Sequence, residues 1–298
     1  MIGRGNDMIR SILRKASQQG LIALVSAALA TMAFVAPVSA QVQIDADPPA
    51  SVGAPAGGPP KGWSFSLGLG AAAVPDYEGS EDYKGAPLPI ARVQKGHQYG
   101  LLFGTRLSSN LIPHPNWRAG PLIEFVPKRS NVDNKKVDRL SSVDAALMVG
   151  AQVGYDLRLN PGVLGFEVDW THDVIDGNGG WIARPRIKYR RKIGEKWGLN
   201  IASTLTYASD DYMETYFTID QADSTRSGLS TFSADAGIKD VGANVALTYN
   251  FNENWALGGI LGYKRLLNDA EDSPVTKVGS ENQFLGGVFF TYSWQAGS

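Results

Sequence analysis

The chain has 298 residues, with 28 basic residues, 29 acidic residues and no cysteine. Nucleic-acid-binding chains cluster lysine and arginine to replace counterions, so this scattered and nearly balanced charge argues against a nucleic-acid partner. The absence of cysteine excludes disulfides, thiolate metal sites and a cysteine nucleophile. The 34 glycines, seven tryptophans, eleven tyrosines and 19% charged residues fit strands that face lipid better than an ordinary soluble enzyme.

The first 40 residues have the pattern of a secretory signal peptide. Four basic residues precede an uncharged stretch over residues 21–36, and small residues up to Ala40 form a cleavage site. The stretch is shorter than the roughly 20 residues of a membrane-spanning helix, and no basic cluster follows it. We therefore expect residues 1–40 to be a signal peptide cleaved after Ala40, with translation starting at Met1 or Met8.

Residues 41–62 contain five prolines and almost no side chains to bury. Such a composition is typical of a flexible tether. We expect a Pro/Gly-rich periplasmic leader over residues 41–62, followed by one folded domain over residues 63–298.

From Trp63 to Trp294 the sequence repeats one pattern, in which large apolar residues alternate with small or polar ones. A period of two predicts β-strands with one apolar face. The expected strands lie near residues 63–73, 88–107, 117–127, 142–155, 163–173, 181–192, 197–207, 240–250, 254–266 and 282–294.

Aromatic residues stand at the ends of these strands, as in the interfacial girdles of a transmembrane barrel. The girdle residues are Trp63, Tyr155, Tyr189, Trp197, Tyr249, Trp255 and Trp294. No apolar run after the signal peptide reaches the length of a spanning helix, and in a bilayer every strand edge must be paired. The sequence therefore predicts an all-β fold, a transmembrane antiparallel up-and-down β-barrel.

The spacing of the strands predicts their number. Bacterial barrels keep short turns in the periplasm and long loops outside. The expected short turns are residues 160–162, 194–196 and 252–254, and the expected long loops are residues 128–140, 174–180, 208–239 and 266–281. Strict alternation gives ten strands. If residues 89–95 and 99–107 are separate strands, a further strand such as 212–219 is needed, and the count becomes twelve.

Charged residues alternate along the two strands joined by residues 176–180. The expected lumen charge ladder consists of Glu167, Asp169, Asp173, Arg184, Arg186, Lys188 and Arg190. If paired residue numbers sum to about 355, Asp169 faces Arg186 and Glu167 faces Lys188, and opposite charges across a strand pair are stabilising. A salt-bridged interior is the preferred interpretation, and an ion-selective constriction is the alternative.

Motifs for catalysis, cofactors and metals are absent from the sequence: there is no G-x-S-x-G, no H-E-x-x-H and no P-loop. Outer-membrane hydrolases use Ser/His or Asp/His pairs at a barrel rim, and His97, His114 and His172 are weak candidates for such a pair. For His172, which stands beside Asp173, a girdle or hydrogen-bonding role is the preferred interpretation. The acidic loop clusters could hold a divalent ion between lipopolysaccharide phosphates, although solvated loop charges are the preferred explanation. These clusters are Asp76, Glu78, Glu81 and Asp82, and Asp269, Glu271 and Asp272. We expect no catalytic, cofactor-binding or metal-ligating residues.

Four segments carry a family resemblance: residues 75–83, 212–217, 236–240 and 265–274. In this order and spacing they resemble the MipA/OmpV family of outer-membrane proteins, over residues 63–294. The family-motif loop residues are Asp76, Tyr77, Glu78, Gly79, Ser80, Tyr83, Asp269, Ala270, Ser273 and Pro274.

The resemblance implies a monomeric barrel of the cell outer membrane, in contact with lipid and lipopolysaccharide and without a cofactor. It also implies a scaffold that connects a periplasmic lytic transglycosylase with a peptidoglycan synthase. Two alternatives stay open: a porin-like channel or surface adhesin, and an outer-membrane hydrolase.

Overall fold

The computed structural model describes residues 59–296. The chain divides into two compact units, residues 1–37 and 38–298, and the first of them lies wholly outside the described residues. The predicted signal peptide, most of the predicted leader and the last two residues therefore also lie outside them. No helix within residues 59–296 is long and apolar enough to cross a membrane.

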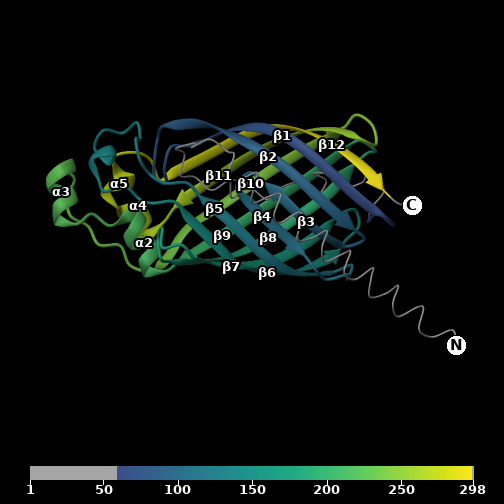
Figure 1. Ribbon diagram of the computed structural model, residues 1–298, viewed down its shortest axis with the longest axis horizontal. Coiled ribbons are helices and arrows are strands. Elements are labelled where there is room, and N and C mark those ends of the chain that lie inside the picture. The colour runs from purple at the N-terminus through teal and green to yellow at the C-terminus, as the bar shows by residue number, and fades with distance from the viewer. Residues whose placement is uncertain (1–58, 297–298) are drawn as a thin grey trace. The chain divides into compact units, whose positions relative to one another are not determined.

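Twelve antiparallel strands close into one barrel (Figure 1), and each strand pairs with its neighbours in the sequence. The first and last strands, β1 and β12, pair from Trp63↔Ala296 to Ala73↔Gly286 and so close the barrel. The strands are β1 (Trp63–Pro75), β2 (Tyr83–Lys95), β3 (Gln98–Phe103), β4 (Arg106–Asn110), β5 (Trp117–Val126), β6 (Ala146–Arg158), β7 (Val163–Asp173), β8 (Trp181–Ile193), β9 (Trp197–Ala208), β10 (Gly237–Asn250), β11 (Trp255–Leu266) and β12 (Asn282–Ala296).

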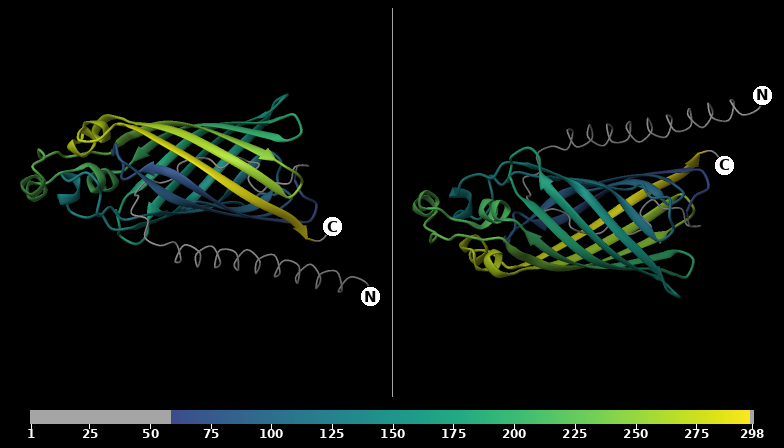
Figure 2. Two further views of the ribbon diagram at one scale, coloured as in Figure 1. Left: turned by 90° about the horizontal axis from the view of Figure 1, so that it is seen from above. Right: turned by 90° about the horizontal axis from the view of Figure 1, so that it is seen from below.

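The two ends of the barrel differ. Short turns join β6 to β7, β8 to β9 and β10 to β11 at the end where β1 begins and β12 finishes. Figure 2 shows the helices gathered at the opposite end. They are η1 (Val137–Arg139), α2 (Asp210–Phe217), α3 (Gln221–Ser227), α4 (Asn268–Asp272) and α5 (Pro274–Lys277). By the rule for bacterial barrels, the short-turn end faces the periplasm and the long-loop end faces outward.

The preferred count of ten strands was wrong, and the twelve that the sequence left open is the number observed. The expected single strand 88–107 is broken by two turns of two residues, which begin at Gly96 and Gly104 with φ of 58° and 60°. Glycine reaches this left-handed conformation without the strain that a Cβ adds. The segment 212–219, suggested as the extra strand, instead lies mostly in the helix α2 and continues past its end at Phe217.

The hairpin β3–β4 does not reach the full height of the barrel. β2 pairs with β3 only from Ile90 onward, so residues 83–88 have a strand partner on one side only, namely β1. The amide of Gly104 donates to the carbonyl of Pro89, so by strand alternation Pro87 also turns its backbone toward the unpaired side. Proline has no N–H there to leave unsatisfied.

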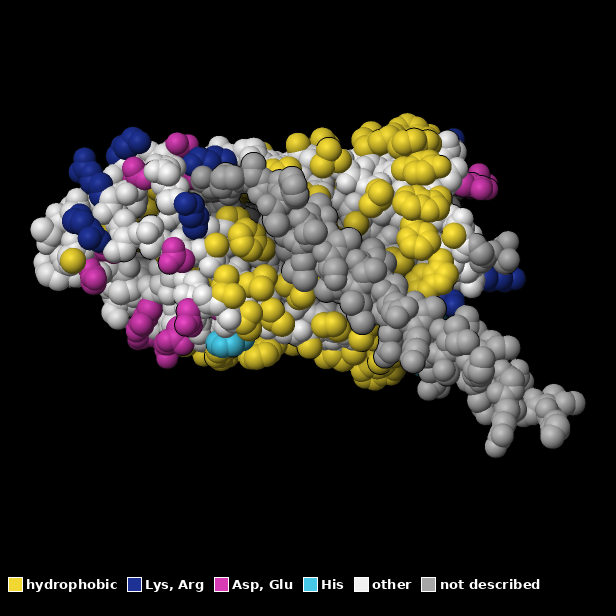
Figure 3. Space-filling model, in the orientation of Figure 1, with side chains coloured by type: hydrophobic (Ala, Val, Ile, Leu, Met, Phe, Trp, Pro, Cys, Tyr) yellow, Lys and Arg dark blue, Asp and Glu magenta, His cyan; other side chains and the backbone are white. Residues whose placement is uncertain are grey.

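The outer wall is apolar in its middle, as a lipid-facing surface requires. Figure 3 shows hydrophobic side chains over the barrel wall, while charged side chains gather at the helical end. Leu69, Leu261 and Val288 are 67%, 70% and 62% exposed. Together with the closed sheet, this exposed apolar band defines a membrane-spanning barrel.

All seven predicted girdle residues lie near the short-turn end. Ring pairs there are Trp117–Tyr155, Trp197–Tyr249 and Trp255–Tyr292, with centroids 5.0, 4.8 and 4.6 Å apart. Trp63 and Trp294 lie at the same end, each in contact with Phe65. Tyr189 lies opposite Leu164, the second residue of β7, with its ring beside Gly162 of the short turn. Rings at the opposite end, Trp181 with Tyr207 and Tyr263 with Phe284, were not among the predicted residues.

Candidate functional site: the lumen and its two mouths

A buried cluster of carboxylates and guanidinium groups fills one side of the lumen. Asp169 of β7 accepts from Arg106 at 2.6 Å, from Arg184 at 2.8 Å and from Arg186 at 2.9 Å. Arg184 also reaches Glu124 of β5 at 2.7 Å. Every one of these side chains is at least nine-tenths buried. An ion pair in such surroundings keeps its strength only because the charges are shared among several partners.

The network continues toward the short-turn end. Glu167 accepts from Lys188 at 2.6 Å and lies 3.4 Å from Arg118. Arg118 contacts both oxygens of Asp156, at 2.6 and 2.7 Å, and Arg190 reaches the same carboxylate at 2.5 Å. The charges therefore form one connected column along the inner faces of β4 to β8.

The predicted register of this hairpin was wrong by two residues. Asp169 lies opposite Arg184, and Glu167 lies opposite Arg186. The ion pairs Asp169–Arg186 and Glu167–Lys188 are nevertheless present, at 2.9 and 2.6 Å, because long basic side chains reach their partners diagonally.

Asp173 does not belong to the column, which corrects its place in the predicted charge ladder. Its carboxylate accepts from the backbone amides of Leu147, Ile175, Asn178 and Gly179. It therefore organises the turn after β7 instead of pairing with a basic side chain.

Four members of the column were missed at the sequence level: Arg106, Arg118, Glu124 and Asp156. Arg118 and Glu124 stand on the same face of β5, because their positions differ by six and side chains on one face of a strand recur every second residue. The same alternation that located the β7–β8 charges could have found this pair.

The opposite side of the lumen is apolar. Phe103 of β3 and Phe289 of β12 meet edge to face with ring centroids 5.8 Å apart. Around them lies a buried cluster of small and aliphatic side chains: Ala72, Val74, Leu88, Ile90, Leu101, Ala246 and Ile260. A Cβ added to Gly258 would come within 2.1 Å of the Phe289 ring, so this glycine makes room for the ring. Packed apolar side chains and the ion-pair column together fill the cross-section of the lumen.

The long-loop mouth is filled by helices. α2 buries Tyr212, Met213, Tyr216 and Phe217 against strand ends and against Ala270 of α4. A second cluster joins Tyr77, η1 and α5. The outer end is thus a packed cap and not a set of open loops.

The family-motif residues meet inside this cap. Glu78 accepts from Lys239 at 2.5 Å, from Lys264 at 2.8 Å and from the hydroxyl of Tyr212 at 3.2 Å. Burial alone would raise the pKa of Glu78, but the two ammonium groups hold this pKa at about 2. Burial raises the pKa of the Tyr77 phenol above its ordinary value.

The acidic loop residues are held by lysine and arginine. Asp76 pairs with Lys84 at 2.7 Å, and Glu271 pairs with Arg265 at 2.9 Å. Ser273 accepts from the amide of Val275 and donates to the carbonyl of Phe217. Within residues 59–296 no group of three or more acidic or histidine side chains is placed to hold a metal ion.

The short-turn mouth contains a cavity of about 600 Å³. Its charged lining is mostly basic, with Arg92, Arg118, Arg158, Arg190, Arg191 and Lys192 against Asp156 and Glu195. Pro59, the first described residue, also lines it. We refer to this space as the basic vestibule.

The three histidines lie in different surroundings. His97 and His114 both line the basic vestibule, and His114 Nδ1 accepts from the amides of Asn116 and Trp117. His172 stacks on Trp170 and contacts the carbonyl of Gly180. None of these recorded contacts joins a histidine to a serine or a carboxylate.

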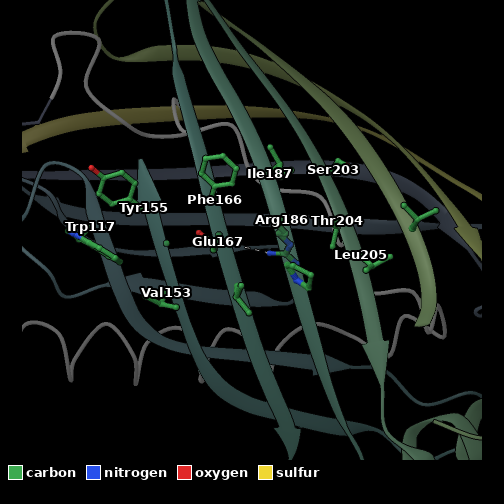
Figure 4. Close-up of a pocket in the computed structure, with 14 residues that line it drawn as sticks. Trp117, Val153, Tyr155, Phe166, Glu167, Arg186, Ile187, Ser203, Thr204 and Leu205 are labelled. Carbon is green, nitrogen blue, oxygen red and sulfur yellow. Dashed lines mark ion pairs between the residues drawn. The ribbon is translucent and has the colours of Figure 1, made fainter. Parts of the chain in front are cut away.

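A shallow groove of about 460 Å³ crosses the lipid-facing wall from β5 to β10 (Figure 4). Ile187, Phe166 and Tyr155 are labelled along it. The β8–β9 pairing is interrupted between Ala183 and Arg186, where Pro185 cannot donate to β9. Its apolar lining is suited to lipid chains.

The closed sheet, apolar wall and aromatic rings define an outer-membrane β-barrel. Residues 67–294 match the family described as MltA-interacting protein MipA. Because this match covers most of the chain, the protein belongs to that family, as its motif segments indicated.

Relatives of known description agree with this location. The chain is 29% identical over 174 residues to "Putative outer membrane protein YiaT" of Escherichia coli K12, covering 58% of this chain and 65% of that protein, so it spans less than two thirds of that relative. Among solved structures, the COG4313 outer membrane channel from Pseudomonas putida F1 has a TM-score of 0.45 at 14% identity, covering 84% of this chain and 100% of that one. The NanC porin has a TM-score of 0.40 at 10% identity, covering 76% and 98%.

Proposed function

We propose that this barrel is a non-conducting scaffold of the outer membrane, which binds a periplasmic lytic transglycosylase and a peptidoglycan synthase at its inner face. The observation that carries the proposal is the obstruction of the lumen. Side chains pack across it, and the outer mouth is filled by α2, α4 and α5. A barrel without a continuous water-filled path is better suited to interaction than to transport.

The family supports the choice of partner. It is described by an interaction with MltA, and the resemblance seen in the motif segments implies the same pair of enzymes. The described surface available to a periplasmic partner includes the short turns 160–162, 194–196 and 252–254. No catalytic step is part of the proposal.

Conductance separates this proposal from the porin alternative. The purified full-length mature barrel is inserted into a planar lipid bilayer at 1 M salt. The Debye length is then about 3 Å, so charges interact only at short range. We expect no stable open level. A large, steady conductance in the unmodified protein would overturn the scaffold and favour a channel.

Retention of the enzymes tests the interaction itself. The immobilised barrel is incubated with a purified periplasmic lytic transglycosylase and, separately, with a peptidoglycan synthase. Glu195→Lys with Glu253→Lys reverses two exposed charges on the short turns and should weaken retention. Glu81→Lys with Asp211→Lys makes the same change at exposed sites of the opposite end and should leave it intact. Equal loss with both pairs would contradict a periplasmic binding face.

A further inference from the structure

The groove on the lipid-facing wall follows one row of paired residues across the strands (Figure 4). Trp117 pairs with Tyr155, Tyr155 with Phe166, and Phe166 with Ile187. Ile187 in turn pairs with Ser203 of β9. All five side chains are exposed on the outer wall. Because neighbouring strands lie about 4.8 Å apart, the groove from β5 to β10 is about 24 Å long.

This row climbs from the periplasmic end of the barrel to its middle. Counted from the short-turn end, Trp117 is the first residue of β5, Phe166 the fourth of β7 and Ser203 the seventh of β9. With strands tilted by about 40°, a line of this length across them rises by about 15 Å, half of the roughly 30 Å hydrocarbon core. The lower end lies at the girdle ring pair Trp117–Tyr155. The groove therefore spans the periplasmic leaflet from the head-group boundary to the middle of the bilayer.

The lining of the groove is apolar on the side that faces lipid. Above the girdle ring pair, its one outward-facing polar side chain is Ser203, and the hydroxyl of Ser203 donates to the carbonyl of Gly242 at 3.1 Å. Glu167 and Arg186 lie behind the groove, buried and joined by an ion pair of 3.8 Å (Figure 4). The groove thus opens to lipid, and the ion-pair column stands between it and the lumen.

The hollow is part of the folded wall. Ser203 has Ala243 as its neighbour on β10, so two small side chains adjoin at the upper end of the row. Beside them Pro185 interrupts the pairing of β8 with β9, as a residue without a backbone N–H does. Both features belong to the strands themselves, so the groove exists before a ligand arrives. A preformed site lowers the entropy cost of binding.

Packing decides what stays on such a wall, because lipid chains are as apolar as the wall itself. A chain on a flat wall is contacted from one side, whereas a chain in a groove is contacted by the floor and both flanks, and each further atom contact adds attraction. A second barrel would present a convex wall, which cannot follow the hollow. Lipopolysaccharide lies in the opposite leaflet, so its chains reach only the upper end of the groove.

We propose that the groove binds one acyl chain of a diacyl phospholipid from the periplasmic leaflet, with the glycerol backbone of that lipid at the Trp117–Tyr155 ring pair. The groove is continuous with the lipid-facing surface, and its volume of about 460 Å³ lies within the roughly 300–1,000 Å³ of small-molecule sites. This lipid site does not rest on the proposed scaffold, because it lies on the wall and not at the short turns. It holds whether or not an enzyme is bound.

Native mass spectrometry of the full-length mature barrel tests the site. The protein is freed of lipid in a nonionic detergent and titrated with palmitoyl-oleoyl phosphatidylethanolamine and, separately, with purified lipopolysaccharide. We expect one phospholipid to be retained at concentrations where further copies are lost, and no such distinct first copy of lipopolysaccharide. Phospholipids that bind without a distinct first copy, or lipopolysaccharide that is retained more tightly through Ser203, would overturn the proposal.

Matched variants locate the bound chain. Ser203→Leu fills the hollow and should weaken retention of the first phospholipid about tenfold, because the chain loses contacts with the floor. Val168→Phe narrows the same groove from β7 and should act in the same direction. Ala71→Leu adds a large side chain at an exposed position of β1 and should leave retention unchanged.

Ser203→Ala separates the hollow from the hydrogen bond. It removes the hydroxyl that donates to Gly242 but keeps the space, so retention should stay as in the wild type. Heat-modifiable migration confirms that each variant is folded. Unchanged retention in both Ser203→Leu and Val168→Phe, or equal weakening by Ser203→Leu and Ala71→Leu, would overturn the proposal.

Discussion

Lys239 and Glu78 form an ion pair of 2.5 Å beneath the outer cap, although 161 residues separate them in the chain. Lys264 contacts the same carboxylate, and Lys239 lies 5.3 Å from the centroid of the Tyr212 ring. One carboxylate thus connects the β1–β2 loop with β10 and β11 under the helix α2. The loop that carries the family motif is therefore part of the barrel's closure.

Glu78→Gln should destabilise the barrel by about 3 kcal/mol, at the lower end of the cost of breaking a buried ion pair, because it removes the carboxylate that both ammonium groups share and leaves Asp240 as the acid beside them. Glu81→Gln in the same loop changes an exposed side chain and should stay within about 0.5 kcal/mol. Urea unfolding in detergent, followed by tryptophan fluorescence, measures both. Similar losses for the two variants would contradict a specific role for Glu78.

Acid should weaken the same cap. The pKa of Glu78 is about 2 in the folded barrel against an ordinary 4.5. The unfolded chain therefore binds a proton at this carboxylate more readily than the folded barrel does, and acid favours unfolding. The stabilisation is complete above about pH 4.5 and is lost as the pH falls toward 2. Proteolysis of the long loops at pH 7, 4 and 2.5, with an acid-active protease at the lower values, should accelerate only below pH 4.5 in the wild type. In Glu78→Gln, residue 78 no longer titrates, so the rate of proteolysis should rise less between pH 4.5 and pH 2.5 than it does in the wild type.

Asp169 and Arg184 should behave as a coupled pair. Either single change to alanine removes one member of the buried network and unbalances its charge, although Arg184 keeps Glu124 and Asp169 keeps Arg106 and Arg186, and should cost about 3 kcal/mol. The double variant should cost less than the sum of the single changes, because each removes the other's partner. The free energies of unfolding of all four proteins give the coupling. Strict additivity would show that the 2.8 Å contact contributes nothing specific.

Gly258→Ala should destabilise the lumen, because the added Cβ meets the Phe289 ring. Overpacking of this kind costs about 1–3 kcal/mol. Gly259→Ala is the matched control, since the nearest atom that its added Cβ would meet is the carbonyl oxygen of Gly287, 3.9 Å away. Thermal unfolding of the two variants decides the point, and equal melting temperatures would mean that the ring moves aside freely.

The whole barrel should migrate as a monomer and be heat-modifiable. An unboiled sample keeps its closed sheet in detergent and runs differently from a boiled one. Light scattering of the detergent complex gives the number of chains. A protein that is soluble without detergent and whose migration is unchanged by boiling would contradict the transmembrane barrel.

The strands could be predicted from the sequence because a wall between lipid and a filled lumen imposes a period of two. β7 was expected at residues 163–173 and β9 at 197–207, and the observed bounds are Val163–Asp173 and Trp197–Ala208. The short hairpin escaped because β3 has six residues and β4 five, too few to show an alternation.

The helical cap could not be predicted by alternation. α2 buries Tyr212, Met213, Tyr216 and Phe217, a spacing of one, four and five residues that is typical of a helix face. Recognising a helical period takes a window of about 11–18 residues, and α2 has only eight residues. The predicted register of the β7–β8 hairpin was wrong by two residues. Asp173 accepts from the amides of Ile175 and Asn178 in the turn, so the turn is asymmetric, and the alternation of charges does not reveal such a contact.

Pro87 has a consequence for the crowded membrane around the barrel. An exposed strand edge recruits the strands of neighbouring molecules through its free amides. One of the positions that could donate from the one-sided stretch of β2 is Pro87, so this edge has one amide fewer with which another sheet could pair. The edge of β2 that the short hairpin β3–β4 leaves uncovered is therefore less able to pair with a strand of an adjacent barrel.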